Sequence, residues 1–223
     1  MKKVLLALAL CVGQVGFAWA GPSEPSPATT YGEAMRWYRE AAEAGDSKAQ
    51  FLLGLKYEEG VLVPRDLAKA AEWFEAAADG GHALAQLKLA IMHHRGQGVA
   101  RDLTRAAGWY RKAGEAGLAQ AQFNLGYLYE RGQGVARDAG LAAEWYGRAA
   151  SQGLAQAQYS LGLLYATGTG VARDNVQAYV WLGRAAAQDH PGAARVRDRV
   201  EAAMSPAESA EARRLAGDGA PDR

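Results

Sequence analysis

Along most of the chain, apolar positions recur with the period of an α-helix and are separated by short polar turns. Ala121, Leu125 and Tyr129 follow one another at intervals of four residues, so they share one helical face. After the next turn, Trp145 and Ala149 mark the apolar face of a second helix. The pattern predicts pairs of helices of about 12–14 residues, joined by short turns into antiparallel hairpins.

The turns carry the residues that helix ends need. Gly132 follows the first helix and suits a left-handed C-terminal cap. Asp138 precedes the second helix, where its carboxylate can accept hydrogen bonds from free backbone N–H groups. Val135 points an apolar group back toward the core, and Gly126 lets a neighbouring helix approach closely.

This helical pair is repeated along the chain. Tryptophans recur every 36 residues, at Trp37, Trp73, Trp109, Trp145 and Trp181. A period of 20–50 residues predicts a solenoid, and solenoids mostly act by offering a long surface to a partner. We divide the chain into a half repeat and four full repeats, at residues 31–44, 45–80, 81–116, 117–152 and 153–188.

The recurring motif is A-x-A-Q-x-x-L-G-x-x-Y, then G-x-G-V-x-x-D, then A-x-x-W followed by Tyr, Phe or Leu. It resembles the Sel1-like repeat family, which is related to tetratricopeptide repeats. The resemblance implies an all-α fold, a right-handed α-solenoid. Two copies depart from the motif: residues 60–63 replace G-x-G-V in the first, and the second has Ala90 and His93 in place of glycine and tyrosine.

Residues 189–216 are expected to form C-terminal capping helices. Pro191 breaks the pattern, and Ser205, Pro206 and Glu208 form a capping box with proline at the first helical position. Such polar elements close the end of a solenoid core. Residues 217–223 are expected to be a flexible tail.

The first 20 residues read as a secretory signal peptide. Met1 to Lys3 form a positive start, an apolar stretch follows, and Ala18 and Ala20 fit a cleavage site after Ala20. Two alternatives are an uncleaved anchor, for which the apolar stretch is short, and a lipoprotein on Cys11, which Leu10 disfavours. We therefore expect a periplasmic or secreted protein with a disordered leader at residues 21–30.

Cleavage changes the composition and excludes some classes of function. Loss of Lys2 and Lys3 lowers Lys and Arg from 25 to 23 against 24 Asp and Glu, a net charge of −1. This balance argues against nucleic-acid binding, which needs a basic face. The only cysteine, Cys11, is removed, so no disulfide or thiolate is expected. No later segment is apolar enough for membrane insertion.

Residues present in every copy are interpreted as structural. They are Gln50, Gln86, Gln122 and Gln158, and the Asp series Asp66, Asp102, Asp138 and Asp174. The arginine before each of these aspartates is expected to form a solvated pair with it. The tryptophans are expected to be buried. The glycine-rich turns could suggest phosphate binding, but an aspartate already occupies the helix N-terminus and the lysine of nucleotide-binding loops is absent.

Catalytic and metal-binding patterns are weak. His82 and His93 are too far apart along one helix to share a metal. We expect His93 to pack in the core with a hydrogen bond and His94 to face outward. No serine has the spacing of a Ser-x-x-Lys or G-x-S-x-G motif. No cofactor, metal or catalytic residue is therefore predicted.

The candidate surface follows from the resemblance, which implies that the first helix of each repeat lines the concave side. The predicted partner-binding residues are Phe51, Leu55, Leu87, Ile91, His94, Arg95, Phe123, Asn124, Tyr127, Arg131, Tyr159 and Leu163. Other inward-facing positions include Glu58, Leu84, Gln120, Glu130 and Ser160. Aromatic groups beside arginine are typical of interface anchors. Alternatively, part of this apolar stripe packs against the next repeat.

The predicted function is a non-catalytic protein–protein interaction module of the cell envelope, a monomer that holds a segment of another protein in its groove. One alternative is a cell-wall-directed enzyme or ligand binder, such as a β-lactam hydrolase, although the cysteines of the β-lactam-binding relatives are missing. A second alternative is a self-assembling structural protein, which the polar C-terminal cap disfavours.

Overall fold

The computed structural model describes residues 31–217, and within that range every regular element is a helix. The helices are α1 (Tyr31–Glu43), α2 (Ser47–Glu59), α3 (Leu67–Asp79), α4 (Ala83–Arg95), α5 (Leu103–Glu115), α6 (Ala119–Arg131), α7 (Ala139–Ser151), α8 (Ala155–Thr167), α9 (Asn175–Ala186), α10 (Ala193–Glu201) and α11 (Pro206–Ala216). The all-α repeat solenoid is confirmed. The expected signal peptide (residues 1–20) and leader (residues 21–30), with Cys11, and tail residues 218–223 lie outside the described residues.

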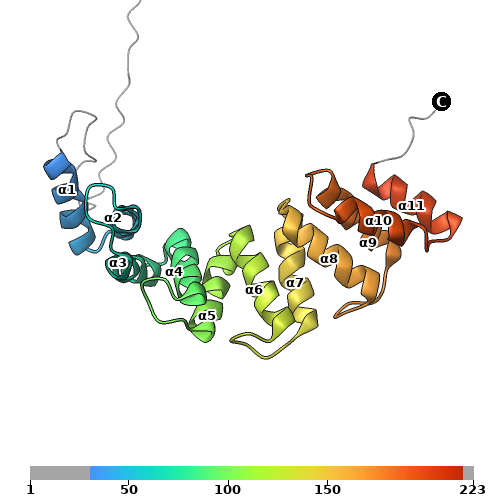
Figure 1. Ribbon diagram of the computed structural model, residues 1–223, viewed down its shortest axis with the longest axis horizontal. Helices are drawn as coiled ribbons and strands as arrows, with labels where there is room; N and C mark the ends of the chain where they lie inside the picture. The colour runs from blue at the N-terminus through green and yellow to red at the C-terminus, as the bar shows by residue number, and fades with distance from the viewer. Residues whose placement is uncertain (1–30, 218–223) are drawn as a thin grey trace, which may run out of the picture.

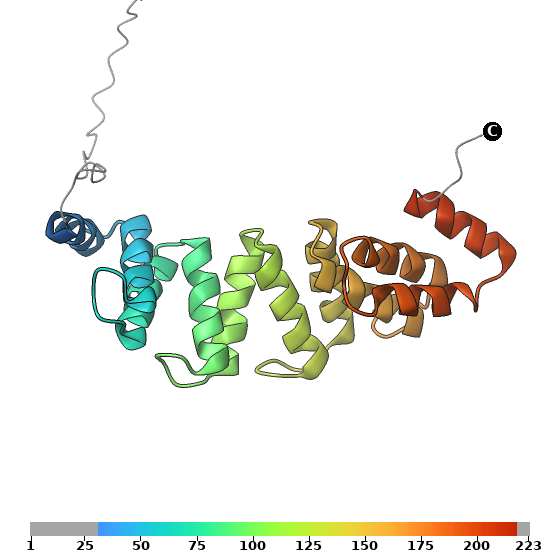
Figure 2. The ribbon, with the colours of Figure 1, turned by 45° about the horizontal axis from the view of Figure 1, so that its top comes forward.

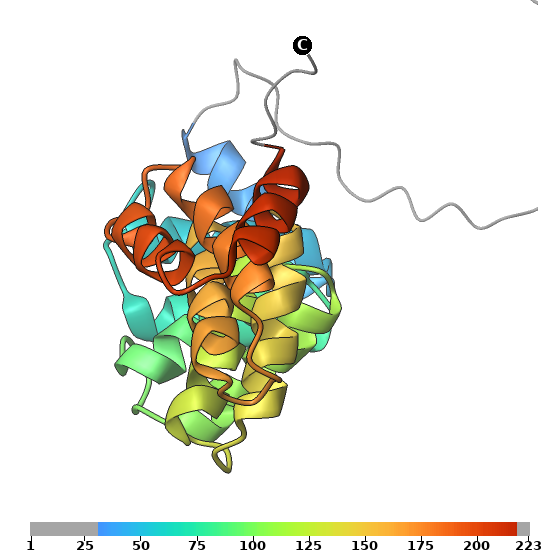
Figure 3. The same cartoon turned by 90° about the vertical axis from the view of Figure 1, so that its right-hand side faces the viewer.

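The helices form an arched row with α1 and α11 at its two ends (Figure 1). Within a repeat the first helix packs on the second, as α4 does on α5, and each second helix packs on the first helix of the next repeat. Helices α10 and α11 pack on α9 and lie in front when the row is viewed from that end (Figure 3). None of the helices described between residues 31 and 217 combines the length and apolar character that a membrane span requires.

The predicted caps are confirmed. The Asp138 side chain accepts a hydrogen bond from the Leu141 backbone N–H at 2.9 Å, and Gly132 adopts the left-handed conformation with φ of 66°. The expected pairing of the preceding arginine with the aspartate is wrong. Arg137 instead donates from Nε to the Glu130 backbone oxygen at 3.1 Å. It thereby satisfies a carbonyl in the last turn of the first helix, which has no partner within the helix.

The glycine-rich turns have a packing role. A side chain on Gly134 would place its Cβ 2.2 Å from the Leu103 backbone oxygen, and the φ of Gly134 is 71°. The turn between α6 and α7 therefore sits directly on the start of α5. The turns after α4 and α6 lie along the same edge of the row (Figure 2). This contact gives the second glycine a structural reason that involves no phosphate.

The recurring glutamines join neighbouring helices. Gln122 donates from Nε2 to the Gly114 backbone oxygen at 2.8 Å, and Gln158 does the same to Ala150 at 3.2 Å. Each bond connects a buried first-helix side chain to the end of the preceding second helix. The structural interpretation of these glutamines is confirmed.

The expected burial of the tryptophans is wrong for most copies. Trp109 is half-buried, with the Lys112 ammonium 4.0 Å from its ring centre. Trp145 is 6% exposed because Gly114 leaves room: a Cβ there would lie 3.1 Å from the tryptophan ring. The large core residue is the next one along the second helix. At that position Phe74, Tyr110, Tyr146 and Leu182 are 0–2% exposed.

The two adjacent histidines of α4 have different surroundings. His93 is 4% exposed, as expected of a core position, but its Nδ1 has no hydrogen-bond partner within the described residues, so the expected hydrogen bond is not found at that nitrogen. His94 is half-buried and faces the first-helix side, where it contacts Tyr110.

Candidate partner-binding face

All twelve predicted contact residues lie on the first helix of a repeat, in α2, α4, α6 or α8. Ten are half-buried, while Arg95 and Arg131 are exposed. A half-buried side chain has packing partners and still offers surface to a ligand. In Figure 1, α2 and α4 lie on the inner side of the arch relative to α3 and α5. The role of these residues in binding stays a prediction.

The apolar stripe is shared between internal packing and the surface. Its members are Phe51, Leu87, Phe123 and Tyr159. Phe51 stacks on His82 with ring centres 4.4 Å apart, and Tyr159 stacks on His190 at the same distance. Phe123 tilts against the buried Tyr146 ring at 5.5 Å. Each of these aromatic rings therefore packs against a neighbouring element and keeps part of its surface exposed.

An open cleft with a volume of about 400 Å³ lies where α4, α5 and α6 meet. Its walls are formed by Ile91, His94, Arg95, Tyr110, Gln120 and Asn124. Five of these were expected on the inward face. Tyr110 was missed because it belongs to a second helix. The remaining predicted residues line this face on either side and do not enter the cleft.

Tyr110 provides the floor of the cleft. Its ring is buried, and its hydroxyl lies 3.4 Å from Nδ1 of His94. Burial raises the pKa of Tyr110 to about 12, although the positive charge of Arg95 acts in the opposite direction. The hydroxyl is therefore protonated at neutral pH and can donate a hydrogen bond to a ligand.

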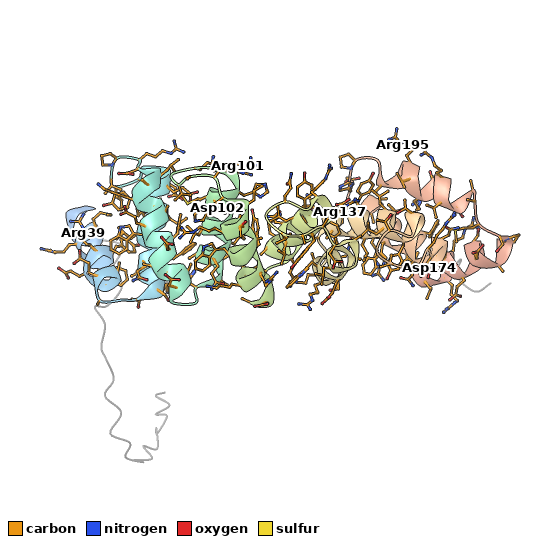
Figure 4. The ribbon with its side chains drawn as sticks, turned by 90° about the horizontal axis from the view of Figure 1, so that it is seen from below. Arg39, Arg101, Asp102, Arg137, Asp174 and Arg195 are labelled. Atoms are coloured by element: carbon orange, nitrogen blue, oxygen red, sulfur yellow. The ribbon has the colours of Figure 1, made fainter. Side chains whose placement is uncertain are left out.

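The rim of the cleft is positively charged. Arg95 is exposed, and Arg101, in the loop that leads to α5 (Figure 4), donates from Nε to the His94 backbone oxygen at 3.1 Å. Burial lowers the pKa of His94, and the charges of Arg101 and Arg95 lower it further. Asn124 accepts through its side-chain oxygen from Gln120 at 3.1 Å, and its side chain also interacts with the Tyr110 hydroxyl. Its amide carries two N–H groups, so at least one can still donate to a ligand. None of the six lining residues is acidic.

The third repeat fills the corresponding place from within. Tyr146 occupies the position of Tyr110, and its hydroxyl donates to Oε2 of Glu130 at 2.7 Å. Burial, together with the hydrogen bond to Glu130 and its negative charge, raises the pKa of Tyr146. On the rim, the Arg131 guanidinium lies 5.4 Å from the Tyr127 ring centre. The hydroxyl of Tyr146 therefore already has a hydrogen-bond acceptor within the third repeat.

The outer repeats have no hydroxyl at this position, which is Phe74 in the first and Leu182 in the fourth. In the first repeat Glu58 accepts from Nζ of Lys88 at 2.7 Å, a bond that also forms an ion pair. In the residues described, no three His, Cys, Asp or Glu side chains gather as a metal site would require. The cleft between α4, α5 and α6 therefore offers hydrogen-bond donors and apolar surface to a ligand.

The repeats match a known family model, described as the Sel1 repeat, over residues 31–46, 47–82, 83–118, 119–154 and 155–190. No curated protein matches the chain. Among solved structures, c5321, a protective antigen present in uropathogenic Escherichia coli strains, is 33% identical with a TM-score of 0.73. The match covers 85% of this chain and 42% of the antigen, so the chain spans less than half of that protein.

A Sel1 repeat protein from Oxalobacter formigenes is similarly close. It is 32% identical, with a TM-score of 0.70, and the match covers 83% of this chain and 78% of that protein. Both structures share the repeat solenoid described above.

Proposed function

Because the chain belongs to the Sel1 repeat family, we propose that it is a non-catalytic interaction module that holds a segment of a partner protein along its first-helix face. Sel1-repeat proteins are generally protein-interaction modules. The partner segment would place a few apolar side chains along the half-buried stripe, while rim charges set its orientation.

The observation that carries the proposal is the contrast between packing and surface positions. The glutamines that join neighbouring helices recur in all four full repeats, whereas the position of His94 reads Glu58, His94, Glu130 and Ala166 from one repeat to the next. Packing of the helix pairs alone does not require such variation, since the glutamines make the same helix-to-helix hydrogen bond in each copy. Exposed arginines beside half-buried aromatic groups resemble the rim and anchors of a protein interface.

The partner-binding test is a pull-down from envelope extract with the purified protein. The variant Arg95→Glu/Tyr127→Ala/Arg131→Glu alters the first-helix face at two exposed residues and one half-buried residue. The matched control is Arg105→Glu. Arg105 is an exposed residue of α5, a second helix, and its guanidinium lies 4.0 Å from the Glu75 carboxylate of α3. We expect a protein that is captured by the wild type and the control but lost by the triple variant. Equal capture by all three would move the site off this face.

We also propose that the protein is exported and monomeric. The N-terminal pattern of Lys2 and Lys3, an apolar stretch and Ala18-Trp19-Ala20 supports export, and the polar helices α10 and α11 at one end support a closed array. Fractionation of cells that express a C-terminally tagged chain, with N-terminal sequencing of the product, should give a mature protein that starts at Gly21. Light scattering should give the mass of one chain at every concentration.

The enzyme alternative is tested separately. The purified protein is expected not to hydrolyse nitrocefin. Turnover by the wild type would contradict the non-catalytic proposal even if a partner protein is captured.

A further inference from the structure

The first and third repeats each hold a carboxylate at the position that His94 occupies in the second. In the first repeat it belongs to Glu58, which accepts from Lys88, and in the third to Glu130, which accepts from Tyr146, both at 2.7 Å. Both glutamates are half-buried. Two copies of one structural unit therefore place a carboxylate at the same point of the first-helix face.

The second repeat keeps the donors and lacks the acid. Tyr110 stands where the third repeat has Tyr146. Asn124, from the first helix of the third repeat, occupies the position that Lys88 has in the second repeat. Arg95 repeats the rim arginine of the third copy. The hydroxyl of Tyr110 lies 3.4 Å from the ring nitrogen of His94, beyond the usual length of an O–H···N bond, and it also interacts with the Asn124 side chain, so it meets no carboxylate. The donor set of a carboxylate site is present, and no lining residue supplies the carboxylate.

We propose that the cleft between α4, α5 and α6 binds the side-chain carboxylate of a glutamate in the partner segment. The inference rests on the proposed function, because that glutamate would belong to the segment held along the first-helix face. The Tyr110 hydroxyl and the Asn124 amide donate to the carboxylate, and Arg95 adds a charged contact from the rim. Hydrogen bonds to a charged acceptor are about twice as strong as neutral ones.

The glutamate side chain is favoured over a chain-terminal carboxylate for two reasons. The groups that occupy this place in the neighbouring repeats, Glu58 and Glu130, are themselves glutamate side chains. The first-helix face also continues past the cleft on both sides, to α2 and α8, so a bound segment has surface on which to continue in both directions.

The direct test uses small probes and needs no knowledge of the partner. The purified protein is titrated with N-acetyl-glutamate amide while its NMR spectrum reports the Asn124 side-chain amide and the Arg95 Nε–H. N-acetyl-glutamine amide, which has the same shape without the charge, is the control, and N-acetyl-glycine supplies a chain-terminal carboxylate. We expect saturable shifts with the glutamate probe, in the millimolar range for so small a ligand, and none with the glutamine probe.

Variants locate the binding. Tyr110→Phe, a residue type that the first repeat tolerates as Phe74, should weaken binding about tenfold. Glu130→His should create a second site in the third repeat. Arg105→Ala, on the second helices, should bind as the wild type does.

A stronger test fills the cleft from within. His94→Glu would give the second repeat its own carboxylate beneath Arg95, as the third repeat has with Glu130 and Arg131. This variant should raise the melting temperature and abolish binding of the glutamate probe. Its folding can be verified by circular dichroism.

The outcomes separate this inference from the proposed function. Equal shifts with the glutamate and glutamine probes, no saturable shift, or unchanged binding by His94→Glu would overturn the carboxylate site. Tighter binding of N-acetyl-glycine than of the glutamate probe would overturn the choice of a side chain. If the pull-down still depends on the first-helix face in any of these cases, the interaction module stands and only the carboxylate site fails.

Discussion

The second and third repeats have the same backbone plan, but their clefts differ. In the third, Tyr146 donates to Glu130 within the repeat. In the second, Tyr110 faces His94 and an open cleft without a lining acid. The residue opposite the tyrosine hydroxyl, His94 in one repeat and Glu130 in the other, determines whether that hydroxyl donates to a carboxylate of its own repeat.

The comparison also shows which positions a repeat can vary without losing its fold. The tyrosine ring is core in both copies, at 2% exposure for Tyr110 and 1% for Tyr146. The residue opposite its hydroxyl lies at the half-buried edge of the first helix. A change there alters hydrogen bonding and charge while the buried apolar contacts stay the same, so the site can change without a change in the solenoid.

The largest expected effect concerns what the two repeats share. Tyr110→Ala and Tyr146→Ala should each lower the free energy of unfolding by about 3–5 kcal/mol, because each removes a buried aromatic ring. Urea denaturation of both variants measures this, with Trp109→Ala as control. The control should lose less, since Trp109 is half-buried. A much smaller loss of unfolding free energy for one variant would show that Tyr110 and Tyr146 do not contribute equally to the core.

A difference in packing should appear next. At one first-helix position the second repeat has Ala90 and the third has Gly126. A Cβ on Gly126 would lie 2.8 Å from the Tyr146 ring, so Gly126→Ala should destabilise by about 1–3 kcal/mol through overpacking. The reverse change, Ala90→Gly, should cost about 0.5–1 kcal/mol from helix propensity, and more if the lost methyl group leaves a cavity. Denaturation midpoints compare the two, and a neutral Gly126→Ala would mean that α6 and α7 can move apart freely.

Much of this fold could be predicted from the sequence because each copy repeats the same local signals. The helix pairs, the Asp138 cap and the Gly132 turn follow from backbone hydrogen bonding, which depends on residues close in the chain. Burial of the tryptophans could not be judged in this way. Trp109 and Tyr110 are both large and apolar, and only their orientation decides which one is core. Lys112, one turn after Trp109, was the available signal that this face is exposed.

The site was predicted less completely for a related reason. The first helices supplied His94, Arg95 and Asn124, since a residue that varies among copies and faces outward is a candidate. Tyr110 was missed because the hydroxyl of a core residue on the second helix reaches the first-helix side. Its only sequence signal was the variation at one position of the second helix, which reads Phe74, Tyr110, Tyr146 and Leu182. Two copies thus carry a hydroxyl at an otherwise apolar position.

Removal of the hydroxyls alone should separate the two clefts. Tyr146→Phe should lower the free energy of unfolding by about 1–3 kcal/mol, because the half-buried Glu130 loses a hydrogen bond to its charged group. Tyr110→Phe should have an effect of about 1 kcal/mol or less, since its hydroxyl faces the His94 ring at 3.4 Å and the Asn124 amide rather than a carboxylate. Urea denaturation in the same buffer gives both values. Equal losses would mean that the hydroxyl of Tyr110 is as well satisfied as that of Tyr146.

The smallest effect appears only in alkali. Burial raises both folded-state pKa values above the ordinary 10.0, that of Tyr110 to about 12. The pKa of Tyr146 is raised further, because Glu130 adds a hydrogen bond and a negative charge where Tyr110 has Arg95 nearby. The stability linked to each tyrosine is therefore complete below the unfolded pKa of 10.0 and is lost as the pH rises toward the folded value.

A rapid pH jump with detection of tyrosinate absorbance, before the chain unfolds, resolves the two residues. At about pH 12, the pKa of Tyr110, Tyr110→Phe should reduce the initial absorbance change by about half of one tyrosinate. Tyr146→Phe should leave that change nearly intact, because Tyr146 is still protonated in the folded state. If the two variants reduce the change equally, Glu130 does not hold the proton on Tyr146, and the electrostatic difference between the second and third repeats would have to be abandoned.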